Sequence, residues 1–253
     1  MEQEKNILSF PYSYKSIISG ENINYGAFKI KHQKKLIELY EEIEDKETNA
    51  DEMSFVELVE KMCLDLIDIA PNRLFYSDFE YLIFLIRTKS YGEKIQYIKT
   101  IKNPVTNEFE QIPLIFNINT DIKIKGEQGL REKSVPMVNG DILIISPLYY
   151  KEYMEIYKTN KIHKNQINFD IIFNSMRKVI KKDNEAIEFS DFNSKSEYFE
   201  NLEIEDFKNI KIAFSDFPRI DVVKEDEITT DGGTKIKIKT NFGDMTTSFF
   251  VLS

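Results

Sequence analysis

The chain has 253 residues, of which 42% are hydrophobic and 30% are charged, and its formal net charge is -9. This length can bury a full core, and the composition is ordinary for a soluble globular protein. The acidic balance disfavours a protein whose main task is to bind nucleic acid, because such proteins usually carry a basic surplus.

The cysteine content and the length of the apolar runs indicate in which cellular compartment the protein is expected. The single cysteine, Cys63, excludes an internal disulfide and a cysteine-based zinc site within one chain. The first five residues lack the basic start of a secretion signal, and the longest apolar runs, such as residues 81–86, are too short to span a bilayer. We therefore expect a protein of the reducing cytosol with no membrane partner.

The first part of the chain predicts a hairpin followed by two helices. Turn formers alternate with short apolar segments near the start, and residues 25–30 form a predicted strand. Apolar side chains recur at helical spacing over residues 33–43. Ser54 and Glu57 have capping-box spacing, which predicts the start of a second helix. Cys63 lies on the apolar face of that helix, where core packing is favoured over a nucleophile because no histidine is nearby.

The most apolar helix of the chain is predicted to start at Ser77. Ser77 and Glu80 again have capping-box spacing, and Gly92 supplies a residue that can close the helix after Ser90 or Tyr91. Apolar side chains cover most of its faces: Phe79, Tyr81, Leu82, Ile83, Phe84, Leu85 and Ile86. This pattern is typical of a helix that is buried on most sides, so we expect the core to be built around it.

Arg87 lies within this apolar helix and needs a partner if it is covered. One alternative is an ion pair or a carbonyl cap inside the chain. The other is a contact with a binding partner.

Strands are predicted between this helix and residue 146. Near-continuous apolar runs at residues 95–101 and 112–118 flank turn residues and predict a β-hairpin. Residues 122–125 and 142–145 are two further predicted strands, the second of them after an Asn-Gly-Asp turn.

Helices are predicted over most of the remaining chain. The signals are a proline start at Ser146-Pro147, helical spacing of Phe169, Ile172, Phe173, Met176 and Ile180, capping-box spacing of Ser194 and Glu197, and helical spacing of Phe207, Ile210 and Phe214. Strict alternation of lysine and isoleucine over residues 235–239 then predicts a strand after a Gly-Gly turn. Its lysines are typical of a guarded edge strand, and a basic ridge for nucleic acid is the minor alternative.

Together these elements predict an α+β fold. Helices pack on a small, mostly antiparallel sheet, and a mainly helical C-terminal half with a terminal hairpin follows. The expected division is an α+β domain over residues 1–146 and a mainly helical region over residues 147–253.

Catalytic and metal-binding motifs are missing from the sequence. It has no phosphate-binding loop, dinucleotide glycine motif, nucleophile elbow or zinc-binding histidine pair, and its two histidines, His32 and His163, are far apart. We therefore expect no enzyme activity, no cofactor and no metal. A hydrolase that uses two carboxylates stays a remote alternative, because 43 acidic residues make chance pairs common.

Several short segments occur in the order of a known family. They are Phe10-Pro11-Tyr12, Asp78-Phe79-Glu80-Tyr81-Leu82, Ile86-Arg87, Ser90-Tyr91-Gly92-Glu93, Glu197-Tyr198-Phe199-Glu200-Asn201-Leu202, Asp206-Phe207-Lys208-Asn209-Ile210, Phe214, Phe217-Pro218-Arg219-Ile220 and Phe249-Phe250. In these segments the chain resembles the baseplate hub subunit family of T-even-type contractile-tailed bacteriophages (myoviruses). Members of that family often carry cysteine pairs in the hairpin after the central helix and before the terminal aromatic pair, whereas both regions lack cysteine here.

The resemblance implies a hub subunit or hub assembly factor, such as a chaperone, that acts by protein contacts during tail morphogenesis. Implied partners are baseplate hub or tape-measure proteins, and neither nucleic acid nor a membrane is implied. The expected location is the host cytoplasm during assembly, or the virion baseplate if the chain is a permanent structural subunit. Partner identity, stoichiometry and oligomeric state stay open.

The last residues contain an apolar cluster, Phe249, Phe250, Val251 and Leu252, where most chains are polar. One interpretation is a last strand beside Ile236 and Ile238 in the protein's own sheet. The other is a surface that binds a partner, for which these four residues and Arg87 are the candidates.

Overall fold

The computed structural model describes residues 10–44, 49–159, 164–189, 192–230, 233 and 235–240. Within these ranges lie eight helices: α2 (Ile30–Glu44), α3 (Asn49–Leu64), α4 (Tyr76–Tyr91), α5 (Ile118–Asp121), α6 (Tyr150–Thr159), α7 (Lys164–Ser175), α8 (Phe192–Glu200) and α9 (Ile204–Phe214). The same ranges hold twelve strands: β1 (Tyr12–Lys15), β2 (Asn22–Tyr25), β3 (Lys94–Lys102), β4 (Phe109–Asn117), β5 (Ile122–Lys125), β6 (Lys133–Pro136), β7 (Ile142–Ile145), β8 (Met176–Ile180), β9 (Ala186–Glu188), β10 (Arg219–Val222), β11 (Glu225–Thr229) and β12 (Lys235–Lys239).

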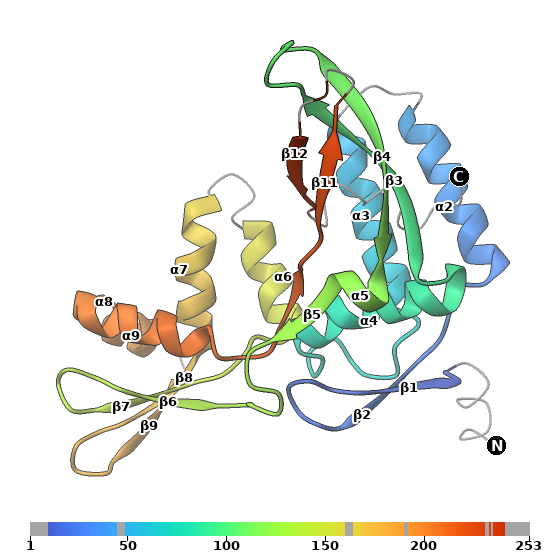
Figure 1. Cartoon of the computed structure of the whole chain (residues 1–253). Coiled ribbons are helices and arrows are strands. Elements are labelled where there is room, and N and C mark those ends of the chain that lie inside the picture. Colours follow the sequence, from blue (N-terminus) through green and yellow to red (C-terminus); the bar gives the residue numbers. More distant parts are fainter. Residues whose placement is uncertain are drawn as a thin grey trace, which may run out of the picture.

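All described strand pairs are antiparallel, and they form five small sheets. Four of these sheets have two strands each, namely β1–β2, β3–β4, β5–β10 and β11–β12. The fifth has four strands in the order β6–β7–β8–β9. Figure 1 shows the β3–β4 hairpin rising alongside α2 and α3, while the four-stranded sheet lies at the opposite end of the molecule.

Helix α4 is at the centre of the larger of two hydrophobic cores. Phe79, Leu82 and Ile86 recur at helical spacing and are at most 1% exposed, so the predicted core helix is confirmed. The β3–β4 hairpin turns alternate residues, including Ile95 and Phe116, into the same core. This alternation follows from the period of two in a strand.

The smaller core lies between the four-stranded sheet and the helices that cover it (Figure 1). Leu143 of β7 and Met176 of β8 meet Ile172 of α7 and Ile210 of α9 there. Each of these side chains is at most 4% exposed. β7 has no polar side chain, which suits this position, because it has a partner strand on each side and Leu143, Ile144 and Ile145 are all buried.

The prediction of a mainly helical C-terminal half is wrong. It is not mainly helical, because β8 to β12 all lie beyond residue 146, and helices and strands make up 38% and 31% of the structure. The front of the chain also does not form one sheet, since its strands belong to separate small sheets. Met176 and Ile180 were predicted to continue a helix, but α7 ends at Ser175 and both residues lie in β8.

Strand pairing connects the two regions expected on either side of residue 146. β7 pairs with β8, and β5 pairs with β10, so each region contributes strands to sheets of the other. The independence of residues 1–146 and 147–253 as folding units stays a prediction.

Other predicted elements are confirmed with small shifts. The predicted hairpin is β3–β4, with Asn103 to Glu108 at its turn, and the strand expected at residues 235–239 is β12, which pairs with β11. Gly92 follows α4 with φ of 89°, a conformation that glycine adopts at little cost. Residues 25–30 are not a strand, since β2 ends at Tyr25 and α2 begins at Ile30.

Candidate binding cavity between the two cores

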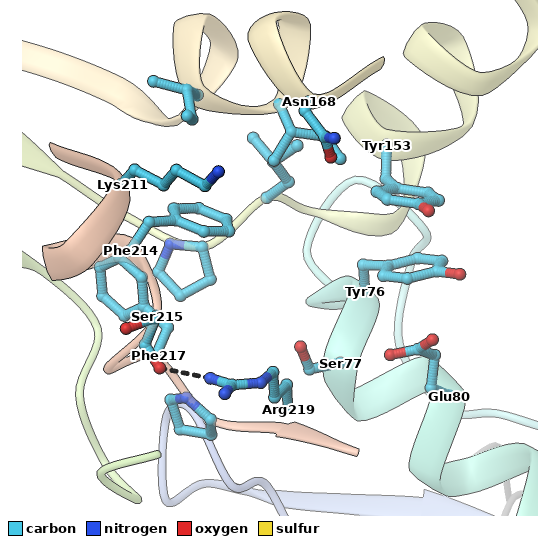
Figure 2. A pocket seen from close by; sticks show the side chains of 15 residues that line it. Tyr76, Ser77, Glu80, Tyr153, Asn168, Lys211, Phe214, Ser215, Phe217 and Arg219 are labelled. Carbon is cyan, nitrogen blue, oxygen red and sulfur yellow. Dashed lines mark hydrogen bonds between the residues drawn. The ribbon is translucent and has the colours of Figure 1, made fainter. Parts of the chain in front are cut away.

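A cavity of about 400 Å³ lies where the two cores meet (Figure 2). Most of its wall is apolar, and its residues come from α4, α6, α7, α9, the start of β10 and the segments before α6 and after α9. The lining residues are Tyr76, Ser77, Glu80, Pro147, Leu148, Tyr153, Asn168, Ile171, Ile172, Lys211, Phe214, Ser215, Phe217, Pro218 and Arg219. Such a volume can accept one or two side chains of a bound partner.

One wall of the cavity consists of two stacked tyrosines. The rings of Tyr76 in α4 and Tyr153 in α6 lie 3.6 Å apart between centroids and 15° from parallel. Burial raises the pKa of the Tyr76 hydroxyl well above its usual value, and the neighbouring Glu80 adds to this shift. Both hydroxyls therefore stay neutral near pH 7, and the stack forms a rigid aromatic surface between the two cores.

Glu80 is the carboxyl group of this cavity. Burial raises its pKa to about 7, and a hydrogen bond with Tyr76 offsets part of that rise. The capping-box role predicted for Glu80 is wrong, because α4 begins at Tyr76 and Phe75 precedes it without a side-chain cap. Ser77 thus lies inside the helix, and Glu80 lies on the face that turns towards Tyr153 (Figure 2).

Two cationic side chains stand on the opposite side of the cavity. The Arg219 guanidinium donates a hydrogen bond to the Ser215 carbonyl, which holds it across the end of α9 (Figure 2). Lys211 extends from α9 over the ring of Phe214. Glu80 is the only carboxylate among the lining residues, so this cavity does not contain the carboxylate pair that a hydrolase of the remote alternative would need.

Arg87 is only 4% exposed, and its guanidinium bonds to carbonyls of its own chain. It donates to the Gly92 carbonyl at 2.9 Å and to the Lys94 carbonyl at 3.4 Å, and it lies 4.8 Å from the ring centroid of Tyr91. These contacts correspond to the carbonyl-cap alternative, and they join the end of α4 to the start of β3. A contact of Arg87 with a partner stays a prediction.

The other predicted partner-binding residues, Phe249, Phe250, Val251 and Leu252, lie outside the described residues. The structure therefore tests neither of the two interpretations of this segment.

Cys63 and His32 occupy the positions of structural residues. Cys63 is fully buried in the larger core, where burial raises the pKa of its thiol, so core packing is confirmed. The His32 ring accepts a hydrogen bond from the Lys29 backbone N–H at 2.9 Å. Partial burial, together with Lys31, Lys29 and Lys35, lowers the pKa of His32. His163 lies outside the described residues.

The lysine face of β12 is balanced by acidic residues on β11. Lys237 stands opposite Glu227 and Lys239 stands opposite Glu225, while Lys235 forms an ion pair with Glu227 at 2.9 Å. A nucleic-acid ridge needs an unopposed row of cations, and this hairpin face alternates in sign instead. These pairs of opposite charges across the two strands stabilise their register.

Within the described part of the chain, no group of three histidine, cysteine, aspartate or glutamate side chains is placed to hold a metal ion. No helix there is long and apolar enough to cross a membrane.

Sequence reasoning missed the cavity itself. Its walls combine α4 with α6, α7 and α9, and no local pattern shows that these helices meet. One signal was available: Glu80 is the only charged residue between Phe79 and Ile86, and a carboxyl at such a position is a candidate for burial with a perturbed pKa.

Comparison with known families gives a match over residues 10–240 to the family described as T4 bacteriophage base plate protein. The match covers most of the chain and includes both cores and the cavity between them. The chain therefore belongs to this family of bacteriophage baseplate proteins. Comparisons with curated proteins and with solved structures give no match.

Proposed function

We propose that this chain acts in assembly of the tail baseplate hub, as a hub subunit or as an assembly factor that binds other phage proteins. The observation that carries the proposal is the family match over residues 10–240, together with the hub-family segments that the sequence resembles. Hub or tape-measure proteins are the proposed partners. The proposed location is the host cytoplasm during assembly.

A role through protein contacts, without catalysis, is supported by the character of the cavity. It offers an aromatic and aliphatic wall, one carboxyl group of raised pKa and two cations, which suits a partner side chain that is apolar with a polar tip.

Mass spectrometry of purified virions and of infected-cell lysate tests the two forms of the proposal. An assembly factor is expected in the lysate at levels comparable to baseplate proteins and at trace levels in virions. A permanent subunit of the baseplate is expected in virions at a fixed ratio to the other baseplate proteins.

Affinity capture tests which proteins the chain binds. The full chain carrying an N-terminal tag should retain individually expressed hub or tape-measure proteins of the same phage. Normal tails with a complete hub in a phage that lacks the gene would overturn the proposed role.

A further inference from the structure

The two faces of the β3–β4 hairpin differ sharply in how they are covered. On the inward face, the hydroxyls of Tyr97 and Thr240 lie 2.6 Å apart, and the Lys99 ammonium donates to the Lys239 carbonyl at 2.9 Å. The end of β12 therefore lies against this face. The outward face consists of the even-numbered residues of β3 and the odd-numbered residues of β4, and every one of these from Lys94 to Ile115 is exposed.

The outward face has an apolar centre. Ile98 is 62% exposed and stands directly opposite Pro113, while Ile115, one row further along, is 53% exposed. Side chains opposite each other on one face of an antiparallel pair are in contact, and the diagonal neighbours are within reach. Two rows away on the other side, beyond the polar row of Thr100 and Gln111, Phe109 is 74% exposed. Apolar residues therefore occupy the middle of this face and its turn end, with Thr100 and Gln111 between them.

Charge on this face is of one sign. Its outward positions include Lys94 near one end and Lys102 at the other, separated by about 26 Å at the rise of an extended strand. None of its outward residues is an aspartate or a glutamate, although the chain as a whole carries a net charge of -9. The apolar residues of this face thus lie between a cation at each end, with no carboxylate among them.

The hairpin offers a face for docking more readily than an edge. Pro113 has no backbone N–H, which disfavours addition of a further strand along β4. A second copy of the chain is a poor occupant, because a two-fold contact of this face with itself would place Lys102 of one copy near Lys94 of the other. The complementary surface is therefore apolar and carries carboxylates.

We propose that the outward face of the β3–β4 hairpin docks an apolar segment of another phage protein, with carboxylates of that protein at Lys94 and Lys102. The inference rests on the proposed function in baseplate assembly and names a surface through which it would act. The cavity between the two cores is a separate site, lined by other elements.

The test uses the full-length chain and baseplate proteins of the same phage, expressed one at a time, with affinity measured by biolayer interferometry. The double variant Ile98→Ser with Ile115→Ser should weaken binding of one of these proteins at least tenfold. The matched control is Ile204→Ser with Ile212→Ser, because those isoleucines are 79% and 66% exposed on α9. All four positions are exposed, so the variants are expected to fold, and circular dichroism checks this.

Charge is tested separately. Lys94→Glu with Lys102→Glu should also weaken binding at least tenfold and reduce its dependence on salt, while Lys31→Glu with Lys34→Glu on α2 should change neither. Wild-type affinity in both hairpin variants would overturn the inference and leave the proposed function standing. If the wild-type chain binds none of the baseplate proteins, both are overturned.

Two other occupants are distinguished in the same experiment. Sedimentation of the wild-type chain alone would show a dimer lost in Ile98→Ser with Ile115→Ser if a second copy covers the face, and that result would overturn the inference. A chain truncated after Asn241 that binds the same protein more than tenfold tighter would show that the chain's own C-terminal residues compete for the face, which would also overturn it.

Discussion

The Asp78 carboxylate accepts a hydrogen bond from the Tyr14 hydroxyl at 2.8 Å, across 64 residues of sequence. It also accepts from the Ser16 hydroxyl at 2.6 Å and from the Ile17 backbone N–H at 2.9 Å. Asp78 is fully buried in the first turn of α4. On folding, these three donors therefore bond to one carboxylate in place of water. This cluster attaches the β1–β2 hairpin to the central helix.

Replacing Asp78 by alanine is therefore expected to destabilise the protein strongly. The buried hydroxyls of Tyr14 and Ser16 lose their acceptor and the Ile17 N–H loses one of two, so the free energy of unfolding should fall by about 2–4 kcal/mol. Urea denaturation measures the change. Tyr14→Phe alone should cost about 1 kcal/mol and should cost less in the Asp78→Ala background, because the two groups share one hydrogen bond. Equal costs in both backgrounds would show that they act independently.

In contrast to substitution of Asp78, substitution of Glu80 should stabilise the protein at high pH, because the pKa of Glu80 is raised. In the folded state its pKa is about 7, against the ordinary value of 4.5, so the folded chain binds the proton more tightly. The contribution of Glu80 to stability is therefore most favourable below pH 4.5 and is lost as the pH rises towards 7. Above pH 7 the buried carboxylate is ionised and unfavourable.

Glu80→Gln should accordingly be more stable than the wild type at pH 8, by about 1–3 kcal/mol, and close to it at pH 4.5. The measurement is the difference between the urea unfolding curves of the two proteins across this range. Glu108→Gln, at an exposed position in the β3–β4 turn, is the matched control and should show no such difference. A Glu80→Gln variant less stable than wild type at pH 8 would mean that the ionised form is well satisfied in the cavity.

Sequence patterns predicted strands best where the two paired strands are neighbours in sequence and form one hairpin. Residues 95–101 and 112–118 pair with each other across a short turn, so their local pattern contains nearly all the information. β8 is different because its partner β7 lies more than 30 residues earlier. Phe169, Ile172, Phe173 and Met176 have helical spacing, yet Ser146 N–H bonds to the Ser175 carbonyl and Met176 pairs with Ile145. A distant strand thus decides where α7 ends.

Capping boxes were predicted at three places, and none starts a helix there. Ser54, Ser77 and Ser194 all lie inside helices that begin one to five residues earlier, at Asn49, Tyr76 and Phe192. A serine and a glutamate three residues apart are also ordinary neighbours on a helix surface, so the spacing indicates a helix better than it indicates its first residue. The cavity could not be predicted from local patterns, because it arises only when distant helices meet.

Leu82→Asp should abolish soluble expression. Leu82 is 0% exposed near the middle of α4, and an unpaired carboxylate there costs several kcal/mol against a typical total stability of about 5–15 kcal/mol. Soluble yield and melting temperature are the measurements, with Glu108→Asp as a control at an exposed position. A soluble variant with an unchanged melting temperature would show that the helix contributes little to the core.

Chelators are expected to leave stability and partner binding unchanged. The chain has one cysteine and two separated histidines, which supply no evident site for a soft metal. Thermal melts with and without EDTA measure stability, and elemental analysis measures bound metal. Stoichiometric zinc in the purified protein would contradict the expectation.

Truncation after Asn241 should leave the isolated chain folded and remove its association with hub proteins. The reason is the apolar cluster of Phe249, Phe250, Val251 and Leu252, which must be covered by something and is a candidate surface for a partner. A thermal melt measures the fold, and affinity capture with individually expressed hub proteins measures association. Phe249→Ser with Phe250→Ser in the full-length chain separates loss of the cluster from loss of the whole segment. A truncated chain that aggregates or melts many degrees lower would show instead that these residues belong to the protein's own core, as the alternative of a last strand beside Ile236 and Ile238 predicts.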